Sequence, residues 1–358
     1  DLHSFPTRRS SDLHIGYREL VRQLDRASAR LFGDPAVTFI QITDSLNAIE
    51  IGVAEAQSLN RVRQSAALAG LDADAIAITV RPPGAALATN APLAVVAQAS
   101  TLQTHHRPVY GGFMVQGSGV SGGCTHSFNA RTLGVVTSVF VGASHCTALH
   151  GGVDWADMFQ PAYPAAIGFE FSDPAFFPCS EVVGESAICR YSDAAMFAGE
   201  DGVGLPSYVA KPIATTPDPA ISSIAWNLGA FYVRQEGTVF EGTVEKVGKT
   251  SGWTYGTISS SCSHRRYDNP AVVPPPYKWH LCQVVVAGWG ARSGDSGAPV
   301  FRRIPGTQID IELLGMVVGG IDHVEWWFSP VSAIHAELPA FTAVFCNYPS
   351  DPNNPPGC

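Results

Sequence analysis

Three side chains in this 358-residue sequence are of the types that serine-based nucleophilic catalysis requires. Ser296 lies in the turn "GDSG", directly before the apolar segment "APVF". A serine hydroxyl is a weak nucleophile, so it needs a histidine as base and an acid that orients the histidine. His145 ends the apolar segment "FVGASHC", and Asp193 lies between a polar turn and an apolar segment in "YSDAAMF". The order His, Asp, Ser is one of the known chain orders of such a triad.

Each of these features also has a structural explanation, and the alternatives to a peptidase are an esterase and a metal site. "GDSG" is a common surface turn, and Asp193 could cap a turn. An esterase with the usual nucleophile elbow needs glycine two residues after the serine, where this chain has Ala298. A metal site at His105 and His106 is disfavoured, because adjacent side chains on a strand point to opposite faces. We therefore assign these two histidines to a linker.

Composition excludes several classes of function. Hydrophobic residues make up 46% of the chain and charged residues 15%, which permits a large buried core. The 35 glycines and 26 prolines favour short strands joined by turns. A net charge of -9 without a basic run argues against nucleic-acid and anionic-membrane partners. No uninterrupted apolar run reaches the length of about 18 residues that crosses a bilayer.

The eight cysteines fall two by two along the chain, without C-x-x-C or zinc-like spacing. An even count of this kind favours disulfides in an oxidising compartment, and hence a secreted protein. We expect no metal and no other cofactor. The alternative is buried free thiols in a cytosolic protein. Other pairings remain open from sequence alone. Proximity favours the pairs Cys124–Cys146, Cys179–Cys189, Cys262–Cys282 and Cys346–Cys358.

The first thirteen residues, "DLHSFPTRRSSDL", read back through the genetic code as a widely used DNA-sequencing adapter. We expect residues 1–13 to be an artefact and exclude them from structural reasoning. An export signal is then expected to be missing from this sequence.

The remaining sequence divides into segments that differ in composition and in hydrophobic pattern. Residues 14–82 predict a small α+β unit, with helices at 16–31 and within "EAQSLNRVRQSAALAGL" and strands at "AVTFIQIT", "NAIEIGVA" and "DAIAITV". Residues 83–107, rich in Pro and Ala, indicate a linker. Residues 108–345 predict an all-β unit of barrels or a sandwich, with one short helix at "SAIHAEL". Residues 209–223 have the character of a crossover between its halves, 108–208 and 222–340, and 346–358 form a tail.

The chain resembles the chymotrypsin-like serine peptidases, and most closely the secreted bacterial branch typified by alpha-lytic protease and the streptogrisins. The motifs "VGASHC", "YSDAAMF", "VGKTSGWTYGTI", "GDSGAPVF" and "GMVVGG" carry the likeness, which covers about residues 108–338. It implies two antiparallel six-stranded Greek-key barrels with the active site between them, preceded by a pro-region that assists folding and inhibits. The implied protein is a monomer that acts on polypeptides. The linker rich in Pro and Ala predicts processing between Ala97 and Tyr110, so that the mature chain starts near "RPVYGG".

The resemblance also assigns roles within the site. Ser296 attacks the peptide carbonyl, His145 transfers the proton, and Asp193 orients the histidine. The amides of Gly294 and Ser296 form the oxyanion hole. Asp295 is expected to be a buried anion that pairs with Lys246, with Lys249 as the second choice.

The substrate pocket is expected beside Val318, Gly319 and Gly320, with room for a large neutral or apolar P1 side chain. Arg292 would either recruit an acidic P1 residue or lie solvated at the rim. Val318 stands where relatives carry a serine that supports the catalytic aspartate. Glu245 and Tyr255 stand where relatives have a disulfide. The alternative function is a catalytically weak or inactive two-barrel binding protein.

Overall fold

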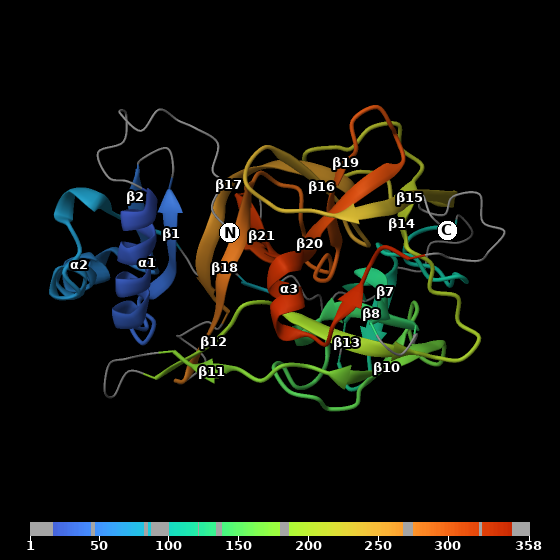
Figure 1. Ribbon diagram of the computed structural model, residues 1–358, viewed down its shortest axis with the longest axis horizontal. Helices are drawn as coiled ribbons and strands as arrows, with labels where there is room; N and C mark the ends of the chain where they lie inside the picture. Colours follow the sequence, from blue (N-terminus) through green and yellow to red (C-terminus); the bar gives the residue numbers. More distant parts are fainter. Residues whose placement is uncertain are drawn as a thin grey trace.

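The computed structural model describes residues 17–43, 47–81, 85–86, 100–120, 122–133, 138–179, 186–267, 275–321 and 324–345. The expected adapter segment, most of the linker, and the tail with Cys346 and Cys358 lie outside these residues. Strands dominate, and Figure 1 shows two curled sheets with a small helical unit at one end of the molecule. The expectation of a β-rich unit preceded by an α+β unit is confirmed at this level.

The N-terminal unit packs two helices on a three-stranded extension of a sheet. Its elements are α1 (Tyr17–Leu31), β1 (Val37–Thr43), β2 (Ala48–Val53), η1 (Ala56–Ser58), α2 (Leu59–Leu68), η2 (Ala73–Ala75) and β3 (Ile76–Val80). Helix α1 buries Leu20, Leu24, Ala27 and Leu31, whose spacing of three to four residues places them on one face. Strand β2 pairs antiparallel with β1 and parallel with β3.

The first half of the β unit forms a sheet in the order β22-β7-β8-β13-β10-β9-β5-β6. Its elements are β5 (Met114–Gly117), β6 (Cys124–Thr125), β7 (Phe128–Thr132), β8 (Ser138–Ala143), η3 (Ser144–Cys146), β9 (Asp157–Phe159), β10 (Ala166–Ser172), β13 (Ala194–Gly199) and β22 (Phe341–Thr342). Phe140 of β8 and Phe197 of β13 stack in its core with ring centroids 4.9 Å apart. This half holds the sequence motifs of His145 and Asp193.

The second half forms the larger sheet, in the order β11-β12-β18-β21-β20-β19-β16-β17-β1-β2-β3. Its elements are β4 (Ala85–Ala86), β11 (Phe177–Pro178), β12 (Ala187–Arg190), β14 (Tyr208–Pro212), β15 (Trp226–Glu236), β16 (Thr243–Gly248), β17 (Gly252–Arg266), β18 (Tyr277–Ala287), β19 (Pro299–Arg303), β20 (Asp310–Ile321), β21 (Glu325–Pro330) and α3 (Val331–Glu337). Strands β18, β21, β20, β19, β16 and β17 are neighbours in this order. Because β17 also pairs with β18, these strands close into a ring. The described pairings of the first sheet form no such ring, so six-stranded Greek-key barrels in both halves remain a prediction.

The N-terminal unit joins this larger sheet directly. Strand β1 pairs antiparallel with β17, with Phe39 opposite Arg265, and Figure 1 shows the blue strands beside the orange ones. The core of the unit continues into Tyr277, Trp279 and Leu281 of β18. The sheet is therefore continuous from the N-terminal unit to the half that carries Ser296.

The structure corrects the expected end of the linker. Residues 100–107 belong to the first half, because Leu102 is fully buried and its carbonyl accepts the Met114 amide at 2.7 Å. The His106 ring is also buried, 4.6 Å from the rings of both Phe113 and Trp226. The local sequence is polar around one leucine, which hid this packing. A mature chain starting near Arg107 would lose these contacts, so processing before Ser100 fits the structure better.

The first residues of the expected crossover, 209–223, belong to a strand. Strand β14 occupies Tyr208–Pro212 and pairs antiparallel with β15, so the first residues of the expected crossover form a strand of the larger sheet. The proline-rich composition of 209–223 concealed a strand whose only proline is its last residue.

Candidate active site

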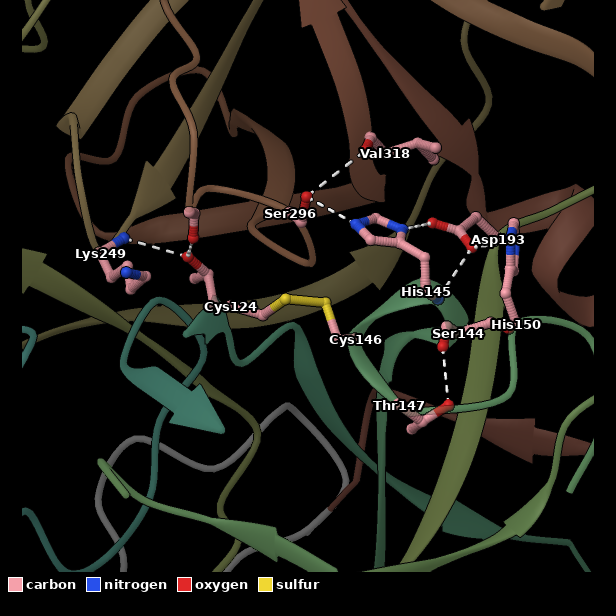
Figure 2. Close-up of a disulfide and its surroundings, with 12 residues drawn as sticks. Cys124, Ser144, His145, Cys146, Thr147, His150, Asp193, Lys249, Ser296 and Val318 are labelled. Atoms are coloured by element: carbon pink, nitrogen blue, oxygen red, sulfur yellow. Dashed lines mark hydrogen bonds and ion pairs between the residues drawn. A yellow bond between two sulfur atoms is a disulfide. The ribbon is translucent and has the colours of Figure 1, made fainter. Parts of the chain in front are cut away.

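The side chains of His145, Asp193 and Ser296 meet between the two halves (Figure 2). His145 Nε2 lies 2.8 Å from Ser296 Oγ, and His145 Nδ1 is hydrogen-bonded to Asp193 Oδ2. The Asp193 and Ser296 residues are fully buried, and His145 is 7% exposed. Three residues that are far apart in the chain thus form one continuous hydrogen-bonded line from carboxylate to hydroxyl.

Strand pairing in the first half places the acid beside the histidine. Strand β8 ends just before η3, which contains His145, and β13 begins just after Asp193. These strands pair antiparallel, with Ala143 opposite Ala194, so the turns at their ends lie side by side. The Ser144 amide donates to the Asp193 carbonyl at 2.7 Å, which fixes the two turns to each other.

The Cys124–Cys146 disulfide connects the histidine turn to the serine turn. Its Cα atoms are 6.2 Å apart, and Cys146 follows His145 directly. Thr125, next to Cys124, donates its amide to the Ser296 carbonyl at 2.8 Å, and its hydroxyl donates to the Gly294 carbonyl at 2.9 Å. One covalent bond therefore braces both sides of the site. The structure also contains the expected disulfides Cys179–Cys189 and Cys262–Cys282.

The Asp193 carboxyl is held in its anionic form. Burial alone would raise its pKa, but the charge and hydrogen bond of His145, aided by nearby His150, hold the pKa well below the usual value. Asp193 Oδ1 also accepts the His145 amide at 3.3 Å. A fixed carboxylate on Nδ1 selects the tautomer in which Nε2 can accept a proton.

The turn around Ser296 requires glycine. Gly294 has φ +96 and Gly297 has φ +86, conformations that other residues rarely adopt. A Cβ at position 294 would also lie 2.5 Å from Thr250 Oγ1. Among the residues described, the amides of Gly294 and Ser296 donate to no protein acceptor. An acceptor outside the protein could therefore bind to both amides.

Asp295 is fully buried and pairs with Lys246, the first of the two expected lysines. Lys246 Nζ lies 3.0 Å from Asp295 Oδ2, and the Thr250 and Ser251 amides donate to Oδ1 at 3.0 and 3.2 Å. Burial opposes ionisation, but Lys246, the Ser251 hydroxyl and the Arg292 amide lower the pKa of Asp295. The second lysine, Lys249, lies beside Gly294 instead.

The strand expected to bind substrate is β20. Ser296 Oγ lies 3.5 Å from the Val318 carbonyl, and Val318 packs its side chain with Val285 and Trp327. Gly319 and Gly320 pair antiparallel with Ala86 and Ala85 of β4.

Arg292 lies in the loop between β18 and β19, and Glu245 and Tyr255 lie on β16 and β17. Arg292 is half-buried, and its Nε makes no hydrogen bond with the residues that the structure describes. Glu245 and Tyr255 face each other across β16 and β17, which is the register that a cross-strand pair needs.

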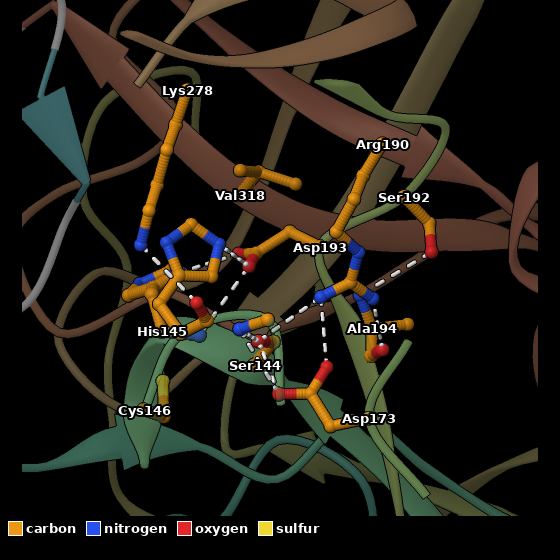
Figure 3. A network of polar contacts seen from close by, with 12 residues as sticks. Ser144, His145, Cys146, Asp173, Arg190, Ser192, Asp193, Ala194, Lys278 and Val318 are labelled. Carbon is orange, nitrogen blue, oxygen red and sulfur yellow. Dashed lines mark hydrogen bonds and ion pairs between the residues drawn. The ribbon is translucent and has the colours of Figure 1, made fainter. Parts of the chain in front are cut away.

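Sequence reasoning missed two groups of residues around Asp193. Arg190 is fully buried, and it donates to Asp173 Oδ1 and to the Ala194 carbonyl, both at 2.7 Å (Figure 3). Asp173 Oδ2 accepts the Ser144 hydroxyl at 2.7 Å. This ion pair thereby clamps the residues next to His145 and Asp193. Its sequence signal is limited to one arginine three residues before the aspartate.

His150 and His280 form the second group. His150 Nε2 lies 3.1 Å from Asp193 Oδ1, on the side of the carboxylate away from Ser296 (Figure 2). Burial lowers the pKa of His150 to about 4. Nothing in the sequence around "ALHGG" or "KWHLC" predicts that these histidines converge on the same carboxylate.

Comparisons with known proteins give matches among solved structures alone. No family model and no curated protein matches this chain. The structure of Thermobifida fusca protease A matches with TM-score 0.43 and 18% identity, over 63% of this chain and 94% of that chain. The structure of Nocardiopsis protease matches with TM-score 0.42 and 20% identity, over 63% of this chain and 94% of that chain. The structure of Cellulomonas bogoriensis chymotrypsin matches with TM-score 0.42 and 20% identity, over 64% of this chain and 94% of that chain. All three are named as proteases or as a chymotrypsin.

Proposed function

We propose that this chain is a secreted serine endopeptidase that hydrolyses peptide bonds through an acyl-enzyme. The observation that carries the proposal is the distance of 2.8 Å from His145 Nε2 to Ser296 Oγ, in line with the Asp193 contact on Nδ1. A general base must lie within hydrogen-bonding reach of the proton that it removes, and this arrangement meets that condition before substrate binds.

The reaction follows from this geometry. Ser296 Oγ attacks the peptide carbonyl carbon while its proton moves to His145 Nε2, and Asp193 stabilises the imidazolium that forms. The proton then passes to the leaving amine, the C–N bond breaks, and the acyl group stays on Ser296. Water then attacks the ester carbon while His145 Nε2 takes its proton. The ester C–O bond breaks, His145 returns the proton to Ser296 Oγ, and the carboxylic acid product leaves. The Gly294 and Ser296 amides stabilise the oxyanion, each worth about 3 kcal/mol in the transition state.

The edge of β20 supports an extended peptide as the ligand. Ala85 and Ala86 pair with Gly320 and Gly319, next to Val318 and Ser296, as a substrate strand would. The N-terminal unit would thus act as an intramolecular inhibitor as well as a folding aid, until it is cleaved from the mature chain. The preference for a neutral or apolar P1 residue belongs to the same proposal. None of the described helices has the length and hydropathy to cross a membrane.

A serine-reactive fluorophosphonate probe tests the function. The expressed and processed protein should react at Ser296, and Ser296→Ala should lose the label. Ser293→Ala, in the same turn, is the matched control and should keep it. An unlabelled, correctly disulfide-bonded and processed wild type would overturn the enzyme in favour of a binding protein. Cleavage of a peptide library mainly after Lys or Arg would contradict the proposed P1 preference.

A further inference from the structure

A second cluster of polar side chains lies behind the triad, on the side of Asp193 that faces away from Ser296. His150 comes from the loop after η3, His280 from β18, and Asp193 from the turn before β13. One ligand atom from each residue lies within 4.8 Å of the other two. Two sequence-distant histidines thus converge on one carboxylate at the junction of the two halves.

The histidines in this cluster have buried nitrogens without partners. Neither ring nitrogen of His150, nor Nε2 of His280, makes a hydrogen bond with the residues described, and all three atoms are buried. His150 Nε2 is 3.1 Å from Asp193 Oδ1, but without the alignment of a hydrogen bond. Buried polar atoms are normally satisfied, so this set of orphaned nitrogens calls for a ligand.

Aromatic rings hold the two imidazoles in place. The ring of Tyr267 lies 4.3 Å from that of His150 and 5.7 Å from that of His280, and Phe176 packs against both, at 4.9 and 5.8 Å. The His150 side chain is 9% exposed, so the cluster reaches the surface at this residue. Both histidines are therefore preorganised by packing, while one of them stays accessible to solvent.

Two other His-containing groups of similar compactness cannot bind a metal in this way. Cys124, His145 and Cys146 form one, and Cys262, His264 and Cys282 form the other. Their sulfur atoms are joined in disulfides. Within the described parts of the chain, His150, Asp193 and His280 are the one such group that contains no disulfide-bonded sulfur.

We propose that His150, Asp193 and His280 form a site for a divalent transition-metal ion, with Zn²⁺ as the probe, and that the bound ion suppresses catalysis. Two imidazole nitrogens and one carboxylate oxygen are a donor set that Zn²⁺ accepts, with solvent completing the coordination. Lys278 Nζ donates to the His150 carbonyl at 3.2 Å. Its positive charge weakens cation binding, which suits a reversible inhibitory site rather than a permanent structural one.

The inhibitory effect rests on the proposed function, whereas metal binding does not. Asp193 Oδ1 would coordinate the ion while Oδ2 stays on His145 Nδ1. The ion would withdraw negative charge from the carboxylate and repel the imidazolium that forms during turnover. The ion does not contact Ser296, so we expect kcat to fall with little change in KM.

Metal binding is tested first on full-length Ser296→Ala that carries no polyhistidine tag. Titration with ZnCl₂ in a calorimeter should give one site per chain, and Co²⁺ should give the visible absorption of a tetrahedral N/O site. Loss of an outer-shell partner alone typically weakens metal binding about tenfold, so His280→Gln in this background should weaken it at least that much. His150→Gln should do the same. His335→Gln, on α3 and distant in sequence, is the control and should leave the affinity unchanged.

Inhibition is tested next on the processed enzyme. Zn²⁺ should lower kcat, a chelator should restore it, and His280→Gln should retain its activity when Zn²⁺ is added. No Zn²⁺ binding by Ser296→Ala, or unchanged affinity in both folded His→Gln variants, would overturn the site; thermal unfolding checks that they are folded. If the protein binds Zn²⁺ in a way that requires His280 but has no peptidase activity, the metal site is supported and the proposed function is wrong. Binding without inhibition of an active enzyme would overturn the regulatory part.

Discussion

Asp193 and Asp295 are both fully buried carboxylates, yet their partners differ in kind. Asp295 pairs with the ammonium group of Lys246 and accepts backbone amides. Asp193 pairs with imidazoles, and His145 gains its charge only when it takes a proton. A buried carboxylate that pairs with a lysine ammonium and backbone amides is suited to hold a turn in place. A buried carboxylate that faces a proton-accepting imidazole is suited to stabilise charge that appears during a reaction.

The largest expected effect is a loss of catalytic activity when Asp193 is replaced, because its carboxylate orients the catalytic histidine. Asp193→Asn keeps the shape but allows the amide to favour the wrong tautomer of His145, so kcat should fall about 10⁴-fold. The free energy of unfolding should change little in comparison. Steady-state kinetics and denaturant unfolding measure the two quantities. A tenfold loss or less would show that Asp193 does not control the histidine.

The next largest effect is a loss of folding stability when the cation that pairs with Asp295 is removed. Lys246→Met leaves the Asp295 charge buried without its cation, and removal of one partner of a buried pair typically costs about 3–5 kcal/mol. The double variant Lys246→Met/Asp295→Asn should recover part of that loss in urea unfolding, because no uncompensated charge remains. Equal stability of the single and double variants would contradict a role for the ion pair.

The disulfide that joins the two turns should have a smaller effect. Replacing Cys124 and Cys146 with alanine opens a loop of sequence separation 22, for which the chain-entropy estimate is about 3 kcal/mol. Replacing Cys179 and Cys189, with separation 10, is the matched control and should cost less. Denaturant unfolding under non-reducing conditions compares them. Activity should fall in the first variant alone, since only that bond braces the histidine and serine turns.

The smallest effect is on acid stability and involves neither carboxylate. Burial lowers the pKa of His126 from 6.5 to about 4, and its Nε2 is 2.7 Å from Asn129 Oδ1. The unfolded state binds the proton more readily, so stability should fall as pH drops from 6.5 to 4, by ~1 kcal/mol per pH unit. His126→Gln should flatten this slope in unfolding curves. An unchanged slope would assign the acid sensitivity to other groups, such as buried His264.

Local patterns in the sequence were sufficient for much of the secondary structure. The expected helix 16–31 is α1, and "AVTFIQIT", "NAIEIGVA" and "DAIAITV" contain β1, β2 and β3. Hydrophobic periodicity and turn residues act over short ranges, so one sequence carries them. The same reasoning failed at residues 100–107 and 209–212, where tertiary packing outweighs a polar or proline-rich composition.

By itself, the sequence determined which residue types could act: a serine in a glycine turn, a histidine before a cysteine, and an aspartate before an apolar strand. Only the tertiary structure decided which lysine neutralises Asp295, and that His150, His280 and the Arg190–Asp173 pair surround Asp193. These contacts join strands and loops from different parts of the chain, through register and packing that no local pattern encodes. The residue types that chemistry needs are therefore legible in the sequence, whereas their partners are set by the fold.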